Sequence, residues 1–75
     1  LDKKQLWVMN NLWAGVKWDE KNVVNYLGKY EELIVSNRNS AIIKVFYFPD
    51  ADMTIFISKP LNEILTWRQE KTNTL

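Results

Sequence analysis

The sequence predicts a small α+β domain made of two helices, a β-hairpin and a C-terminal helix. Apolar residues recur at helical spacing near both ends of the chain. Two runs rich in β-branched and aromatic residues flank a Pro-Asp turn in the middle. Hydrophobic residues make up 47% of the 75 positions, which is enough for a packed core. We therefore expect one domain over residues 1–75, with an ordered core at about 3–68 and a frayed tail at 69–75.

The first helix is expected over residues 3–14. Asp2 can cap it, and Gln5 stands three residues later in the capping-box position. Gly15 is a natural C-terminal stop because a residue without Cβ adopts the left-handed conformation freely. The apolar residues predict the buried face: Leu6, Met9 and Trp13 at i, i+3 and i+7, with Leu12 beside them and Trp7 and Val8 widening the face.

A second helix is expected over residues 20–27, with Asp19 as its N-cap and Gly28 as its stop. Its buried stripe consists of Val23, Val24 and Leu27. The link 14–18 is short, so the two helices should form a helix–turn–helix pair. Residues 29–35 are compatible with a helical turn or with the lead-in to a strand.

The hairpin is expected after a polar loop at residues 36–40. Residues 41–48 form its first strand, Pro49–Asp52 the turn and residues 53–58 the returning strand. An isolated two-stranded hairpin is barely stable, so this one must pack against the helices.

A last helix is expected over residues 60–68. Ser58 or Lys59 would cap it, and Pro60 would occupy the first turn, where its missing N–H costs nothing. Its inner face would consist of Leu61, Ile64 and Leu65. The resulting order is that of a winged helix–turn–helix domain, and a generic small α+β domain would give the same order.

The composition excludes several classes of function. The chain has no His and no Cys, which rules out Ser-His and Cys-His nucleophiles and the His/Cys zinc patterns. The neighbouring carboxylates Glu31–Glu32 and Asp50/Asp52 have no further acidic partner, so we expect no enzyme activity, no metal and no cofactor. No apolar run approaches ~18 residues, so we expect no membrane span. Absence of cysteine fits a cytoplasmic protein.

The chain resembles small uncharacterised proteins from phages and prophages of Gram-positive bacteria over residues 5–68. The matching positions are Trp7, Met9, Leu12, Val23, Leu27, Phe46-Tyr47-Phe48-Pro49, Leu61, Ile64 and Leu65. The layout also resembles phage and transposon excisionases, which are architectural DNA binders without catalytic activity. This resemblance implies a DNA-binding regulator or excisionase-like accessory factor in a bacterial cytoplasm.

In such proteins the second helix enters the major groove of double-stranded DNA and the hairpin contacts the minor groove or the backbone. The resemblance then implies contacts to DNA by Lys17, Lys21, Asn22, Asn25, Lys29, Arg38 and Lys44. Asn suits bidentate recognition of adenine, and Lys reaches phosphate or guanine. The alternative is that these Lys and Asn residues belong to an ordinary solvent-exposed helix surface, where both residue types are common.

Two features depart from a DNA-binding pattern. The hairpin tip Asp50-Ala51-Asp52 carries two carboxylates, which repel phosphates. The charge is +1 over residues 1–28 and −1 over residues 41–57, without a basic excess. The alternative is a phage-encoded interaction module that binds and modulates a host or phage protein through an aromatic surface. Contacts to such a partner, or within a homodimer, would be made by Trp7, Trp13, Trp18 or Trp67. A third interpretation is a structural subdomain of a longer chain.

Overall fold

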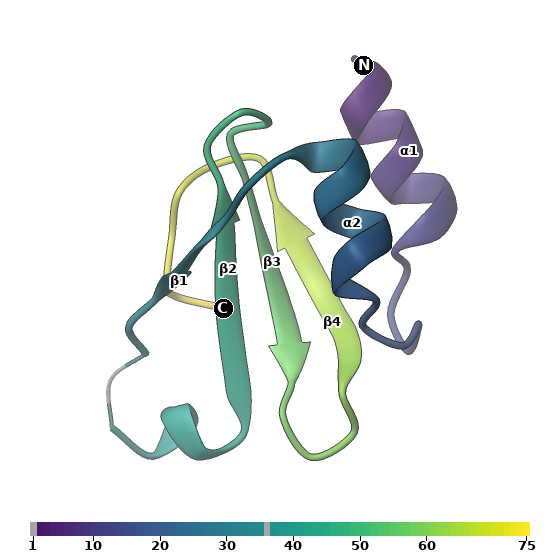
Figure 1. Cartoon of the computed structure of the whole chain (residues 1–75). Helices are drawn as coiled ribbons and strands as arrows, with labels where there is room; N and C mark the ends of the chain where they lie inside the picture. The colour runs from purple at the N-terminus through teal and green to yellow at the C-terminus, as the bar shows by residue number, and fades with distance from the viewer. Residues whose placement is uncertain (1, 36) are drawn as a thin grey trace.

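The computed structural model describes residues 2–35 and 37–75. Two helices precede a four-stranded antiparallel sheet whose strands lie side by side in chain order (Figure 1). The elements are α1 (Lys3–Asn11), α2 (Glu20–Leu27), β1 (Glu31–Leu33), the 3-10 helix η1 (Asn37–Ala41), β2 (Ile43–Phe48), β3 (Met53–Ser58) and β4 (Glu63–Arg68). The α+β class expected from the sequence is confirmed.

Both helices begin at the residues that the capping pattern indicated. The Gln5 amide donates to Asp2 Oδ1 at 2.8 Å, and the Asp2 amide donates to Gln5 Oε1 at 3.0 Å, which completes the capping box. Asp19 caps α2 through the amide of Asn22. Helix α1 ends at Asn11, earlier than expected, and α2 ends before Gly28, whose φ is 92°.

The hairpin forms as expected, but it lies inside the sheet. Strand β2 pairs with β3 from Ile43↔Ser58 to Phe48↔Met53. Strand β1 lies within residues 29–35, for which the sequence allowed either a helical turn or a strand, and it pairs with the outer side of β2. Helix η1 occupies most of the expected polar loop, of which Ser36 is outside the described residues.

The expected C-terminal helix at 60–68 is wrong, because Glu63–Arg68 form strand β4. This strand pairs with β3 from Ser58↔Glu63 to Thr54↔Arg68, with a register irregularity at Phe56/Ile57. The layout of helix, helix, hairpin and helix is therefore not the one observed. The hairpin has neighbouring strands on both sides and does not project as a free wing.

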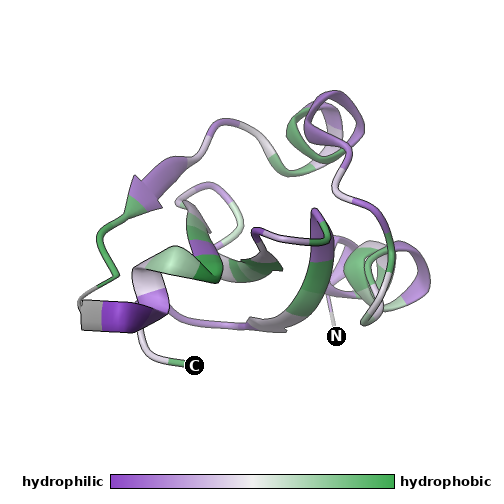
Figure 2. Ribbon diagram, turned by 90° about the horizontal axis from the view of Figure 1, so that it is seen from below, coloured by the Kyte–Doolittle hydropathy of each residue, from purple (hydrophilic) through white to green (hydrophobic). Residues whose placement is uncertain are grey.

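The main core lies between the helices and one face of the sheet. Val8 and Leu12 from the first helix region meet Val23 and Leu27 from α2 over buried strand residues, which are Phe46, Phe48, Met53, Ile55, Ile57 and Ile64. Both helices lie on the same side of the sheet (Figure 2). Burying these side chains is the main favourable contribution to folding.

The opposite face of the sheet carries a smaller apolar cluster and the C-terminal segment. Ile43, Val45 and Phe56 are buried there. The segment after β4 crosses this face toward β1 (Figure 1). Thr54 Oγ1 donates to the carbonyl of Glu70 and accepts from the amide of Thr72 at 3.2 Å.

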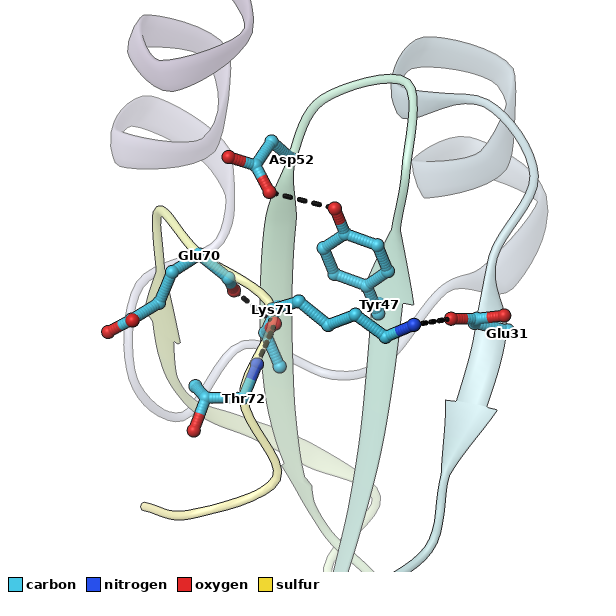
Figure 3. A network of polar contacts seen from close by, with 7 residues as sticks. Glu31, Tyr47, Asp52, Glu70, Lys71 and Thr72 are labelled. Atoms are coloured by element: carbon cyan, nitrogen blue, oxygen red, sulfur yellow. Dashed lines mark hydrogen bonds and ion pairs between the residues drawn. The ribbon is translucent and has the colours of Figure 1, made fainter.

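The end of this segment is attached at the far edge of the sheet. Lys71 Nζ lies 2.7 Å from Glu31 Oε1 and 5.2 Å from the centre of the Tyr47 ring (Figure 3). The side-chain amide of Asn73 donates through Nδ2 to the backbone carbonyl of Ile34 at 2.8 Å. The tail at residues 69–75, which the sequence predicted to fray, thus contacts strands from β3 to β1.

Candidate binding surfaces

The exposed face of α2 carries four of the seven residues that the sequence assigned to DNA. Lys21, Asn22 and Asn25 are exposed on the helix, and Lys29 is exposed just after it. A shallow groove of about 550 Å³ runs along this face. Its lining residues are Glu20, Lys21, Val24, Asn25, Lys29 and Tyr30. The groove therefore combines two cations, one carboxylate and an amide with the apolar surface of Val24 and Tyr30.

Tyr30 is held in the wall of this groove by Glu20. The Tyr30 hydroxyl donates to Glu20 Oε1, and this hydrogen bond, with burial of the ring and the charges of Glu20 and Glu32, raises the pKa of Tyr30 to about 12. Its ring packs on Phe46 at 4.4 Å between centroids. This tyrosine connects α2 to the sheet.

The other three assigned residues lie elsewhere. Lys17, in the link between the helices, donates to the carbonyl of Leu61 at 2.8 Å and lies 3.4 Å from Glu63 Oε2. Arg38 is exposed on η1, at the end of the sheet away from α2 (Figure 1). Lys44 on β2 is half-buried and lies 5.9 Å from the centre of the Phe46 ring. The fold does not gather the seven residues into one surface.

The acidic hairpin tip packs against the rest of the molecule. Lys4 Nζ donates to the carbonyl of Asp50 at 3.4 Å. The carboxylate of Asp50 lies so close to Gly28 that an added Cβ would be 2.8 Å from its Oδ2. Asp52 accepts a hydrogen bond from Tyr47 at 2.7 Å, which raises the pKa of Tyr47 (Figure 3). Asp50 and Asp52 both stay exposed, so the tip presents two carboxylates to solvent, and these would repel DNA phosphates.

The apolar stripe of α1 does not face the core. Leu6, Met9 and Trp13, predicted to be buried, have exposed fractions of 44%, 51% and 61%. The core is contacted instead by Val8, fully buried, and Leu12, which is 5% exposed. We call Leu6, Met9 and Trp13 the α1 seam. A contiguous exposed apolar patch, unlike a single exposed apolar side chain, marks an interaction site.

A groove borders the seam. It has a volume of about 300 Å³ and lies between α1 and β4. Its lining residues are Met9, Leu12, Trp13, Ala14, Leu65, Thr66 and Trp67. The groove joins the seam to apolar side chains of the sheet, so the exposed apolar surface extends beyond the helix.

Sequence reasoning did not identify the seam, although it contains a usable signal. Six of the residues from 6 to 13 are large and apolar, and together they occupy more of the helix circumference than one core-facing stripe can bury.

The four tryptophans have different environments in the fold. Trp7 stacks on Tyr26 at 4.5 Å, Trp18 packs against rings near β2, Trp67 packs on the core, and Trp13 is the exposed one of the four.

The described residues offer little for other chemistry. Within residues 2–35 and 37–75, no three His, Cys, Asp or Glu side chains gather closely enough to hold a metal ion. Neither helix in this part of the chain has the length and apolar character needed to cross a membrane.

No family model, curated protein or solved structure matches this chain. The resemblance to phage proteins and excisionases thus stays a prediction, and the geometry alone must support a functional proposal.

Proposed function

We propose that the protein is a binding module, not an enzyme, and that it docks on a protein partner through the α1 seam. The observation that supports this most is the exposure of Leu6 and Met9 on α1 together with Trp13, which follows the end of the helix. Fully burying such a side chain is worth about 1.5–3 kcal/mol, and these three remain 44–61% exposed, so roughly half of that free energy is not gained in the free protein. A partner surface recovers that free energy.

The spacing of the seam fits a known form of recognition. Leu6 and Met9 are three residues apart on α1 and share one side of the helix, as apolar anchors do when a helix binds in an apolar groove. Trp13 lines one groove with Met9 and extends this apolar surface past the end of the helix. Trp is enriched among the residues that dominate interface energy, and Trp13 is the most exposed residue of the seam. A complete lack of His and Cys agrees with a role in binding.

Site-specific photo-crosslinking tests this proposal. A benzophenone amino acid replaces Met9 in the seam, and the matched control replaces Asn11, which is exposed on the same helix away from the seam. We expect protein adducts in the producing cells from position 9 and not from position 11. Absence of adducts at position 9, or equal adducts at both positions, would contradict the proposal.

A second candidate is binding of double-stranded DNA through α2, as a regulator or excisionase-like accessory factor. The observation in its favour is that Lys21, Asn25 and Lys29 line one groove, with Asn22 also exposed on α2. The net charge of +1 and the packed acidic tip weigh against it.

Fluorescence anisotropy with mixed-sequence duplex DNA separates the two candidates. If α2 binds phosphates, affinity should fall tenfold or more between about 50 and 200 mM salt. Lys21→Ala should then weaken all sequences about equally, whereas Asn25→Ala should relax sequence preference at a cost of roughly 1–3 kcal/mol. No binding at tens of micromolar protein in low salt rules out the DNA function.

A further inference from the structure

We infer that the edge of the sheet at β1 binds an extended segment of another protein, which adds to the sheet as a further antiparallel strand. The segment that fits has a Lys or Arg opposite Glu32 and an Asp or Glu two residues earlier, near Lys44. This site is separate from the α1 seam, so the inference goes beyond the proposed function and does not depend on it. It is carried by the open edge, the hollows beside it and the charges around it.

The two edges of the sheet differ. The start of β4 is covered by the link between the helices, because Gly15 and Val16 exchange backbone hydrogen bonds with Ile64. Strand β1 forms the opposite edge, and within residues 2–35 and 37–75 no strand pairs with its outer side (Figure 1). An edge strand presents backbone N–H and C=O groups with which another extended chain can pair.

Hollow space lies beside this open edge. One hollow of about 450 Å³ lies between β1 and the C-terminal segment, and another of about 270 Å³ lies between the end of β1 and the start of β2. Both are lined by Glu32, Leu33 and Ile34, and Ile34 is 85% exposed. Successive side chains of an added strand point to opposite faces, and hollows along the edge can receive them.

Glu32 supplies the negative charge of the edge. It is paired in register with Phe46, which belongs to the main core, so its side chain lies on the helix side of the sheet. The Glu32 side chain is exposed and makes no ion pair within the described part of the chain. Glu31 lies on the opposite face, where Lys71 is 2.7 Å away. A cation opposite Glu32 on an added strand therefore meets an unpaired carboxylate.

Lys44 supplies a positive charge further along the same face. It is two residues from Phe46 on β2, so it shares the helix side with Glu32, and both line the smaller hollow. Among the residues that the structure describes, Lys44 has no ion pair. Lys59 lines the same hollow and adds a second positive charge. When the register of β1 with β2 is continued, Lys44 lies opposite Ile34, so a carboxylate at this position of the added strand lies near two cations.

These charges disfavour a second copy of this chain as the added strand. An antiparallel pair of β1 strands centred on Glu32 places two carboxylates directly opposite each other, which is destabilising. Residues 31–35 also contain no cation that could face Glu32. A different protein whose segment has an acidic residue, any residue and then a basic residue matches both charges.

Two synthetic peptides of identical composition test the inference. Both are acetylated and amidated, and their sequences are TVEVKVT and TVKVEVT. Added antiparallel, TVEVKVT places its lysine opposite Glu32 and its glutamate near Lys44, whereas TVKVEVT reverses the two charges. At about 20 mM salt, where screening is weak, TVEVKVT should bind with a dissociation constant below about 1 mM. TVKVEVT should bind at least about fivefold more weakly.

Nuclear magnetic resonance and charge reversal locate the site. Titration with TVEVKVT should shift the amide signals of residues 31–34 and not those of α1. Glu32→Lys should weaken TVEVKVT at least about tenfold. The matched control Glu70→Lys makes the same change of net charge at an exposed position in the tail and should leave affinity within about twofold. Far-UV circular dichroism checks that both variants are folded.

Several results would overturn the inference. These are no binding of TVEVKVT at about 1 mM, equal or stronger binding of TVKVEVT, equal effects of the two charge reversals, and shifts that centre on α1 or α2. Dimers of the free protein that Glu32→Lys strengthens or weakens would assign the edge to a second copy and also refute it. Photo-crosslinking at Met9 reports on the α1 seam alone, so failure at β1 leaves the proposed function standing.

Discussion

The two sides of α1 should respond very differently to the same substitution. Leu12→Ala removes three carbon atoms from a side chain that is 5% exposed. At about 0.8 kcal/mol per buried carbon, the transfer term is ~2.4 kcal/mol, and the residual cavity brings the cost to about 3–4 kcal/mol. Leu6 is 44% exposed and water fills the space it leaves, so Leu6→Ala should cost about 1 kcal/mol.

Thermal unfolding at low protein concentration measures this difference. A domain of this size shifts its Tm by roughly 4–8 °C per kcal/mol, so Leu12→Ala should melt about 10–20 °C below Leu6→Ala. Urea unfolding should give the same order with little change in slope. If Leu6→Ala costs as much as Leu12→Ala, the seam contributes to the core and the argument for an interface fails.

Three further predictions concern the rest of the fold. Removing the charged acceptor by Glu20→Gln should lower the pKa of Tyr30 from about 12 toward 10.0 in a spectrophotometric titration. In the wild type this tyrosine binds its proton more tightly when folded, so its stabilising contribution is complete below pH 10.0 and lost as the pH rises toward about 12. Gly28→Ala should cost about 2–3 kcal/mol, because φ is 92° and the new Cβ meets Asp50, and adding Asp50→Ala should restore the steric part only. Thr54→Val should cost about 1–3 kcal/mol and speed hydrogen exchange in the C-terminal segment, since two backbone groups lose their partner; unchanged exchange would show that the segment is not held there.

The parts of the fold that were predicted depend on local signals. Asp2 with Gln5 and Asp19 mark helix starts through side-chain hydrogen bonds to nearby amides, which need no tertiary information. The strands around Pro49–Asp52 were predicted because a turn between two β-rich runs is also a local pattern.

The prediction failed where a segment depends on its neighbours. In β4 the irregularity opposite Phe56/Ile57 interrupts the period-two alternation, so Ile64 and Trp67 face the main core at a spacing of three that imitates a helix. Strand β1 is three residues long and forms only against β2. A choice between two competing faces of α1 likewise needs the position of the sheet, which the sequence did not supply.

The link between the two helices is fixed by the last strand of the chain. Gly15 and Val16 exchange hydrogen bonds with Ile64 at 2.8 Å each, and the Trp18 amide donates to the carbonyl of Asn62 at 2.9 Å. Strand β4 therefore orients the link between the helices across most of the intervening sequence. Contacts between residues so far apart carry a high entropic cost of closure, and such non-local closure slows folding. Until it is complete, both helices expose the apolar side chains that the native fold buries against the sheet, and partly folded states of this kind are prone to aggregate.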